Sequence, residues 1–184
     1  MLRTILKAGI DKTEKTWGYD AGYMRVVLKH SPWSLARFSL VSGMSDRKAA
    51  PGEALAAAGI AATLAEDCGP CVQIGVDMAA AGGVAPQVLR AILAGDEAAM
   101  GEAAALAWRF ARASLARDMA EADPLRDEIV RRWGEKGLVA ISMSLTTARL
   151  YPTLKYALGY GKACSRIVVA GEPAPVVHTP ALAA

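Results

Sequence analysis

The feature of this 184-residue sequence with the clearest chemical capacity is a pair of cysteines separated by two residues. They are Cys68 and Cys71, within the segment AEDCGPCVQIG of residues 65–75. In the first turn of a helix, side chains three residues apart lie on one face, with Cβ atoms about 5–6 Å apart. A small adjustment brings such a pair within disulfide distance. We therefore expect a pair that interconverts between dithiol and disulfide.

The residues around the pair affect its reactivity in opposite directions. Pro70 suits the first turn of a helix, where free N–H groups and the positive end of the helix dipole favour a thiolate. Glu66 and Asp67 place two carboxylates beside Cys68, which disfavours a further negative charge there. Either carboxylate can instead accept a proton from a thiol, and Glu66 is the candidate base. The alternative is a buried, reduced pair that serves only as small apolar residues.

The elements that must position these side chains are predicted to be helices almost throughout. Ala, Leu, Met, Arg and Glu dominate the sequence, and long β-branched runs are absent. An amphipathic N-terminal helix is expected, with Leu2, Ile5, Leu6 and Ile10 on one side. Further helices are predicted over 19–29, 33–43, 51–66, from the cysteines to 81, 86–95, 96–119, from Pro124 to Gly134, over 135–150, and from Pro152 onward. The fold class is therefore an all-α helical bundle, with residues 167–170 as its single strand-like run.

The chain length suits one domain with its own hydrophobic core. We predict a single all-α domain over 1–170, with a helical extension at 1–50 and a core at 51–165. Residues 171–184 form a Pro-rich tail that is expected to be extended or disordered. A weak internal repeat is also expected, because aligning Pro70 with Pro152 superimposes a helix, a break and a proline.

Bulk properties exclude several classes of partner and site. The 21 basic and 18 acidic residues are dispersed along the chain, which argues against a nucleic-acid partner. No uncharged run approaches the roughly 20 residues of a membrane span, so no membrane partner is expected. Three cysteines without an export signal favour the cytoplasm. Only His30 and His178 are present as histidines, so no metal site is expected, and Cys164 is interpreted as a buried core thiol.

The Cys-Gly-Pro-Cys letters match those of thioredoxins, but the flanking sequence does not. A thioredoxin requires strands around the motif, whereas an alanine-rich helix is predicted before Cys68. Asp67 also occupies the position of the tryptophan that precedes the first cysteine in thioredoxins. We therefore interpret the motif as a thiol site in a helical protein.

Residues 50–165 resemble the carboxymuconolactone decarboxylase and alkylhydroperoxidase D superfamily. The resemblance rests on the segment GEALAAAGIAATLAEDCGPCVQIGVDMAAAGGVAPQVLRAILAGD, on a long helix after it, and on RDEIVRRWGEKGLVAISMSLTTARLYPTLKYALG. It implies an all-α homo-oligomer, a trimer, hexamer or dimer, that reduces hydroperoxides with electrons from a dithiol reductant and needs no cofactor. By resemblance, Cys71 is the peroxidatic thiol that becomes a sulfenic acid. Cys68 then donates a proton and resolves the sulfenate into a disulfide.

Two departures from the superfamily pattern affect its usual proton relay. Ala56 stands where the superfamily has a glutamate, and Gly75 stands where it has a histidine. A second function therefore stays open, that of a non-catalytic, oligomeric helical protein that binds a ligand or acts as a scaffold.

Four polar side chains near the second proline are candidates to line a pocket or a subunit interface. They are Arg149, Tyr151, Lys155 and Tyr156. The alternative is that they form an ordinary solvated or packed surface.

Overall fold

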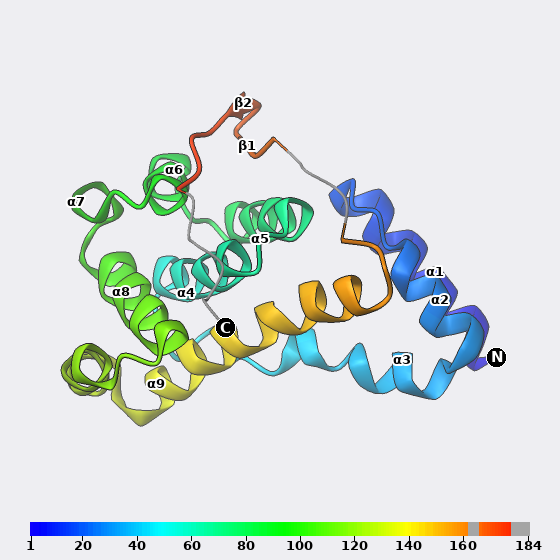
Figure 1. The fold of residues 1–184 in the computed structure, drawn as a ribbon, viewed down its shortest axis with the longest axis horizontal. Helices are drawn as coiled ribbons and strands as arrows, with labels where there is room; N and C mark the ends of the chain where they lie inside the picture. Colours follow the sequence, from blue (N-terminus) through cyan, green and yellow to red (C-terminus); the bar gives the residue numbers. More distant parts are fainter. Residues whose placement is uncertain (162–165, 178–184) are drawn as a thin grey trace.

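The fold is all-α, as the composition predicts, in a computed structural model that describes residues 1–161 and 166–177. Figure 1 shows a central group of helices around α4, with an N-terminal group beside it. The N-terminal group consists of α1 (Leu2–Trp17), α2 (Gly22–His30) and α3 (Pro32–Phe38), followed by the 3-10 turn η1 (Val41–Gly43). The central group consists of α4 (Gly52–Ala65), α5 (Gly69–Ala81), α6 (Pro86–Ala94), α7 (Glu97–Met100), α8 (Glu102–Ala116) and α9 (Met119–Ala157). The strands β1 (Val168–Val169) and β2 (Glu172–Pro173) pair in antiparallel orientation.

The helix predicted over 96–119 is divided by a glycine. Gly101 has a φ of 79°, in the region that favours glycine, so α7 ends before it and α8 begins after it. The next helix then begins before the predicted start at Pro124. The Asp118 side chain accepts a hydrogen bond from the backbone N–H of Glu121 at 3.1 Å and so caps the start of α9.

Helix α9 passes through both prolines that were predicted to start helices. Pro124 and Pro152 both lie inside it, and its non-helical backbone is at Gly134, where φ is 68° and ψ is 178°. Pro152 is buried, and the packing of α9 against α4 outweighs the one backbone hydrogen bond that a proline removes. The predicted break before Pro152 is therefore wrong. The order of helix, break and proline that was expected in both halves occurs only at Pro70.

The helix predicted over 33–43 is also shorter than expected. Helix α3 ends at Phe38, where the backbone N–H of Ser39 still reaches the carbonyl of Leu35 at 2.8 Å. The chain then tightens into the 3-10 turn η1, as helix ends often do.

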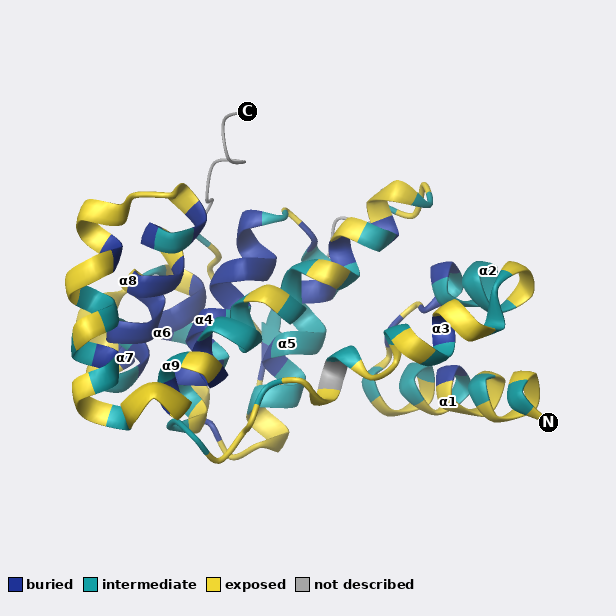
Figure 2. Ribbon diagram, turned by 90° about the horizontal axis from the view of Figure 1, so that it is seen from below, coloured by how far each residue is buried: buried dark blue, intermediate teal, exposed yellow. Residues whose placement is uncertain are grey.

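The N-terminal helices bury a small apolar cluster of their own. Ile10, Tyr23 and Leu35 come one from each helix, and none is more than 4% exposed. In Figure 2, α1, α2 and α3 are mostly teal and yellow with little dark blue, so most of their residues are not fully buried. The predicted apolar side of α1 is only partly buried, because Ile5 is 64% exposed. This group therefore presents apolar surface beyond its own cluster.

Helix α4 forms the centre of the core and is buried along most of its length (Figure 2). Its small side chains permit close approach of the neighbouring helices, α5, α8 and α9. A Cβ at Gly59 would lie 3.3 Å from Ser144 Oγ on α9, which is tighter than most real contacts. The same hydroxyl donates a hydrogen bond to the Leu55 carbonyl at 2.9 Å. The glycine thus allows a polar link between α4 and α9.

The C-terminal segment attaches to α5 and α6. Val168 N–H donates to Gln73 Oε1 at 2.7 Å, and Gln73 Nε2 donates to the Val168 carbonyl at 3.0 Å. Further on, the Val177 N–H donates to the Leu93 carbonyl at 2.7 Å. The strand-like run predicted at 167–170 is confirmed as β1, and the Pro-rich segment is extended as far as it is described.

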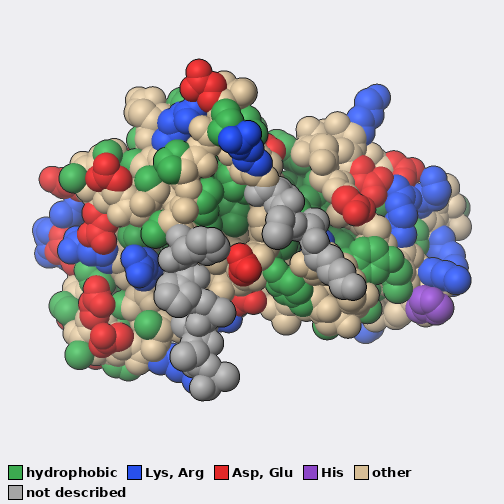
Figure 3. Space-filling view, turned by 45° about the horizontal axis from the view of Figure 1, so that its top comes forward, with side chains coloured by type: hydrophobic (Ala, Val, Ile, Leu, Met, Phe, Trp, Pro, Cys, Tyr) green, Lys and Arg blue, Asp and Glu red, His purple; other side chains and the backbone are tan. Residues whose placement is uncertain are grey.

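The outer surface carries charges of both signs. On the face seen in Figure 3, Lys and Arg side chains are interspersed with Asp and Glu. Over residues 1–161 and 166–177, every helix is too short or too polar to cross a membrane.

Candidate active site

The two cysteines lie at the sharp corner between α4 and α5. Asp67 makes this corner with a φ of 49°, a left-handed conformation that aspartate tolerates better than most residues. Cys68 follows as the N-cap of α5, with Pro70 in the first turn. The backbone N–H groups of Cys71 and Val72 both donate to the Cys68 carbonyl at 2.9 Å. The corner thus places both sulfurs at the start of a helix, as the sequence predicts.

Cys68 and Cys71 are joined in a disulfide, with their Cα atoms 5.2 Å apart. Each is only 3% exposed. Their separation lies in the ordinary range for a disulfide. When the pair is reduced, the positive end of the α5 dipole favours a thiolate in the first helical turn.

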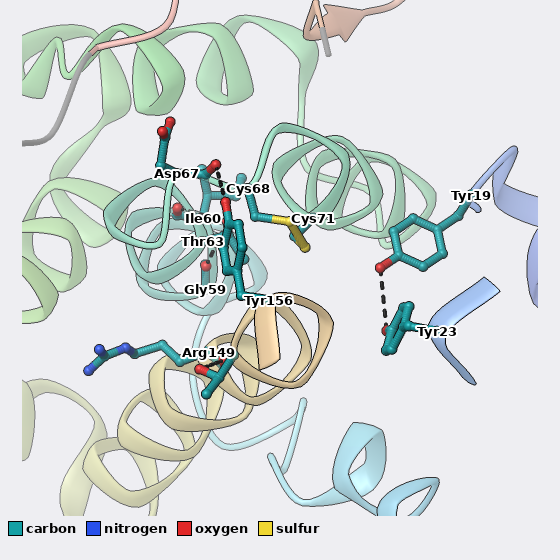
Figure 4. The surroundings of a disulfide bond; sticks show 11 residues. Tyr19, Tyr23, Gly59, Ile60, Thr63, Asp67, Cys68, Cys71, Arg149 and Tyr156 are labelled. Carbon is teal, nitrogen blue, oxygen red and sulfur yellow. Dashed lines mark hydrogen bonds between the residues drawn. A yellow bond between two sulfur atoms is a disulfide. The ribbon is translucent and has the colours of Figure 1, made fainter. Parts of the chain in front are cut away.

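The two neighbouring carboxylates have different surroundings, since Glu66 is paired with α9 and Asp67 is exposed to solvent. Glu66 accepts a hydrogen bond from Arg149 Nε at 2.5 Å, which forms an ion pair between α9 and the end of α4. Asp67 is exposed, and Figure 4 shows its carboxylate directed away from the disulfide. Its backbone carbonyl accepts a hydrogen bond from the Tyr156 hydroxyl at 2.6 Å. Arg149 and Tyr156 therefore hold the α4–α5 corner from α9.

Cys71 lines a cavity of about 720 Å³ between the N-terminal group and the central helices. The walls come from α1 to α3 on one side and from α4, α5 and α9 on the other. Cys68 and Glu66 are not among the lining residues. The disulfide therefore presents one of its sulfurs to the cavity and places the other behind it, toward the corner.

Both departures from the superfamily pattern lie on this same cavity. Ala56 on α4 and Gly75 on α5 line it together with Cys71. A Cβ at Gly75 would meet Ile60 Cγ1 at 3.9 Å, an ordinary contact, so a side chain fits there. The positions that hold a glutamate and a histidine in the resembling superfamily thus share a cavity with Cys71 here, but neither carries an acid or a base.

Most of the polar side chains among the lining residues carry a hydroxyl group. Among the residues that the structure describes, no Asp, Glu or His lines the cavity, and the one charged lining residue is Arg47. The hydroxyl-bearing lining residues are Thr13, Tyr19, Tyr23, Ser39, Ser45, Thr63, Ser144, Thr147 and Tyr151. This wall can donate hydrogen bonds, but it offers no carboxylate or imidazole for proton transfer.

Tyr19 and Tyr23 form a buried phenol pair on the side of the cavity opposite the disulfide. Their hydroxyls lie 3.3 Å apart, with Tyr19 donating to Tyr23, and the rings meet edge to face. Figure 4 shows both hydroxyls on the ring edge that faces the disulfide region. Burial raises the pKa of both phenols above the ordinary value, so both remain protonated hydrogen-bond donors. The sequence analysis did not select Tyr19 and Tyr23 as site residues. The signal that could have identified the pair is its spacing of four residues, which is typical of contacts along a helix.

Lys155 lies beneath this pair and is 3% exposed. Its ammonium lies 5.4 Å from the centroid of the Tyr19 ring, in a cation–π contact. Burial lowers the pKa of Lys155, and the charge of Asp20 partly offsets that shift. Of the four candidates near Pro152, Tyr151 lines the cavity and Lys155 supports its wall.

Comparisons of this chain with protein-family models, with curated proteins and with solved structures give no match. Cys164 and His178 lie outside the described residues. Among the described residues, no group of three or more His, Cys, Asp or Glu side chains is arranged to hold a metal ion.

Proposed function

We propose that this chain is a thiol-dependent peroxidase, or a thiol–disulfide oxidoreductase, that uses Cys68 and Cys71 to reduce hydroperoxides. One observation carries the proposal: Cys71, one half of a disulfide at a helix N-terminus, lines a cavity large enough for a substrate. The resemblance of residues 50–165 to a superfamily with peroxidase members supports the same assignment.

The proposed reaction begins with the reduced pair. The Cys71 thiolate attacks the distal oxygen of a hydroperoxide, so an S–O bond forms and the O–O bond breaks. The departing alkoxide takes up one proton from solvent and leaves as an alcohol, and Cys68 donates its own proton to Glu66. The Cys68 thiolate then attacks the Cys71 sulfenic acid, which forms the disulfide and releases the sulfenic oxygen as water after it takes up one proton. A dithiol reductant restores both thiols and is itself oxidised to a disulfide.

Glu66 is the proposed base for Cys68. Both residues lie at the α4–α5 corner outside the cavity lining, whereas Cys71 faces the substrate side. Arg149 supports this role because it fixes the Glu66 carboxylate beside the corner. We further propose a cytoplasmic homo-oligomer, since the sparse cysteines suit a reducing compartment and the resembling superfamily is oligomeric.

A steady-state assay with cumene hydroperoxide and dithiothreitol tests the proposal. We expect turnover by the wild type, no turnover by Cys71→Ser, and unchanged turnover by Cys164→Ser as the matched control. Peroxide consumption by Cys71→Ser at the wild-type rate would overturn the assignment.

A second function is favoured by one observation, the absence of Asp, Glu and His from the described cavity lining. A non-catalytic helical binding protein would retain the cavity without the relay. Thiol trapping and mass spectrometry after mild peroxide treatment discriminate between the two functions. A reduced pair that never forms the intramolecular disulfide, in a protein whose circular dichroism is unchanged, would favour the binding protein.

A further inference from the structure

We infer that the cavity beside Cys71 binds an aliphatic carboxylic acid and that the hydroperoxide of such an acid is the oxidant. The inference that the cavity binds the acid rests on the cavity alone. The inference that its hydroperoxide is the oxidant rests on the proposed function. Three features carry the inference: the apolar walls, the length of the cavity, and the charge at one end.

The cavity is far larger than a small oxidant requires. A volume of about 720 Å³ lies within the range of small-molecule sites, whereas one water molecule occupies about 30 Å³ in the liquid. The walls are mostly aliphatic on both sides. Their apolar members include Ile10, Leu35, Leu55, Ile60, Ile74 and Met78. A hydrocarbon chain gains by leaving water for such walls, whereas hydrogen peroxide gains nothing from them.

The cavity extends along most of α4. Gly52 at the start of the helix and Thr63 in its last turn both line it. At 1.5 Å per residue, these positions are about 16 Å apart along the helix axis. The Gly52 end meets the far end of α5, since a Cβ at Gly52 would lie 3.8 Å from Val84. The Thr63 end meets Cys71 at the start of α5. An extended chain therefore fits between these two ends.

The two ends differ in charge. Arg47, five residues before Gly52 in the sequence, lines the cavity, is exposed, and has no ion pair or hydrogen bond with another described residue. Its neighbour Asp46 accepts a hydrogen bond from the Lys48 backbone N–H at 3.0 Å. With no carboxylate on the described lining, the complement of Arg47 is an anion, and a carboxylate matches the guanidinium in shape.

The opposite end suits a hydroperoxide group. Tyr19 donates its hydroxyl proton to Tyr23, so Tyr23, which remains protonated and lies on the cavity with Cys71, is the phenol that can donate to a peroxide oxygen. The acid then binds with its carboxylate at Arg47 and its oxidised carbon near the disulfide corner. The S–O bond forms and the O–O bond breaks as in the proposed reaction, which leaves a hydroxy acid.

Binding is tested first with wild-type protein in its disulfide form, which has no thiol to react at the pair. The probe is cis-parinaric acid, a fluorescent unsaturated fatty acid, displaced by lauric acid. We expect saturable binding that weakens at least about tenfold in Gly75→Leu and Ala56→Leu, whose added side chains fill the cavity. Ala80→Leu, on the exposed face of α5, is the control and should bind normally. Circular dichroism verifies the fold of each variant.

The charge is tested with Arg47→Gln, which should weaken lauric acid binding about tenfold and leave dodecanol displacement unchanged. Lys48→Gln is the matched control. Absence of saturable fatty-acid binding would overturn the inference. A second outcome would also overturn it: a wild-type oligomer that binds no fatty acid and that Gly75→Leu dissociates, as measured by sedimentation. A second copy of the chain would then occupy the cavity.

The oxidant is tested with reduced protein and linoleic acid hydroperoxide. We expect a kcat/KM at least about tenfold above that for hydrogen peroxide, with a KM that rises in Arg47→Gln for this substrate but not for cumene hydroperoxide. Turnover of cumene hydroperoxide without fatty-acid binding would overturn the inference and leave the proposed function standing. Fatty-acid binding without turnover of any hydroperoxide would support the binding site and overturn both the oxidant and the proposed function.

Discussion

Arg149 on α9 and Glu66 at the end of α4 form an ion pair, with Nε and Oε1 2.5 Å apart, at the corner that carries the disulfide. The pair is partly buried, with the Glu66 side chain 17% exposed and that of Arg149 38% exposed. It ties the long helix to the corner two residues before Cys68.

Removal of the cation should destabilise the protein. We expect Arg149→Met to lower the free energy of unfolding by about 1 kcal/mol, because it leaves a half-buried carboxylate without its partner while solvent still screens the site. Urea denaturation followed by circular dichroism measures the change. Arg131→Met, at a 70% exposed position of the same helix, is the control and should change stability little.

Loss of the proposed base should affect only the second chemical step. We expect Glu66→Gln to slow disulfide formation about a hundredfold while Cys71 oxidation proceeds at the wild-type rate. Rapid quenching with a sulfenic-acid trap and mass spectrometry should therefore show accumulation of oxidised Cys71. Disulfide formation at the wild-type rate would exclude Glu66 as the base.

The phenol pair gives a third prediction. Tyr23→Phe removes the acceptor of the Tyr19 hydroxyl in a buried site, so the free energy of unfolding should fall by about 1 kcal/mol. With an organic hydroperoxide, kcat should fall more than KM rises if the phenols donate to the peroxide in the transition state. Tyr160→Phe, at a 38% exposed tyrosine, should match the wild type in both measurements.

The burial of Lys155 predicts an unusual pH dependence of the free energy of unfolding. Burial lowers its pKa in the folded protein, so the unfolded chain holds this proton more tightly and stability should rise as pH increases toward 10.5. Lys155→Met should raise the free energy of unfolding near neutral pH by about 1 kcal/mol, since no buried ammonium remains. The difference between variant and wild type should then shrink as the pH rises toward 10.5. A difference that stays constant with pH would contradict this account.

Reduction of the disulfide should have a modest effect on stability. The closed loop spans only residues 68–71, so chain entropy alone predicts a loss of about 2 kcal/mol when the bond is reduced. Thermal unfolding with and without a phosphine reductant measures this loss. The Cys71→Ser protein should unfold at the same temperature under both conditions.

Local chemistry made part of this structure predictable. The CxxC spacing and Pro70 indicated a first-turn thiol pair, and the alanine-rich segment before it indicated a helix. The helix starts predicted at prolines were wrong where tertiary packing or a helix cap determined the bounds of the helix. Pro124 follows a helix start already made by the Asp118 side chain, and Pro152 lies within a helix that tertiary contacts hold together.

The site was less predictable because its contacts are distant in sequence. Glu66 and Arg149 are separated by 83 positions, and no local pattern pairs them. The sequence analysis did not predict the cavity either, because the N-terminal helices that line it lie outside the segment that resembles the superfamily. Tyr19 and Tyr23 become candidate site residues only because the fold places them on the same cavity as Cys71.

The side chain of Gln73 bonds both the N–H and the carbonyl of Val168, as a neighbouring strand would. A single amide on a helix therefore substitutes for one rung of a β-ladder. Both bonds reach main-chain atoms of residue 168. The attachment therefore depends on the side-chain amide at position 73 and not on the side chain at position 168. Sequence drift at 168 should leave this attachment intact, whereas a change of residue 73 would remove both hydrogen bonds between β1 and the helix that carries Cys71.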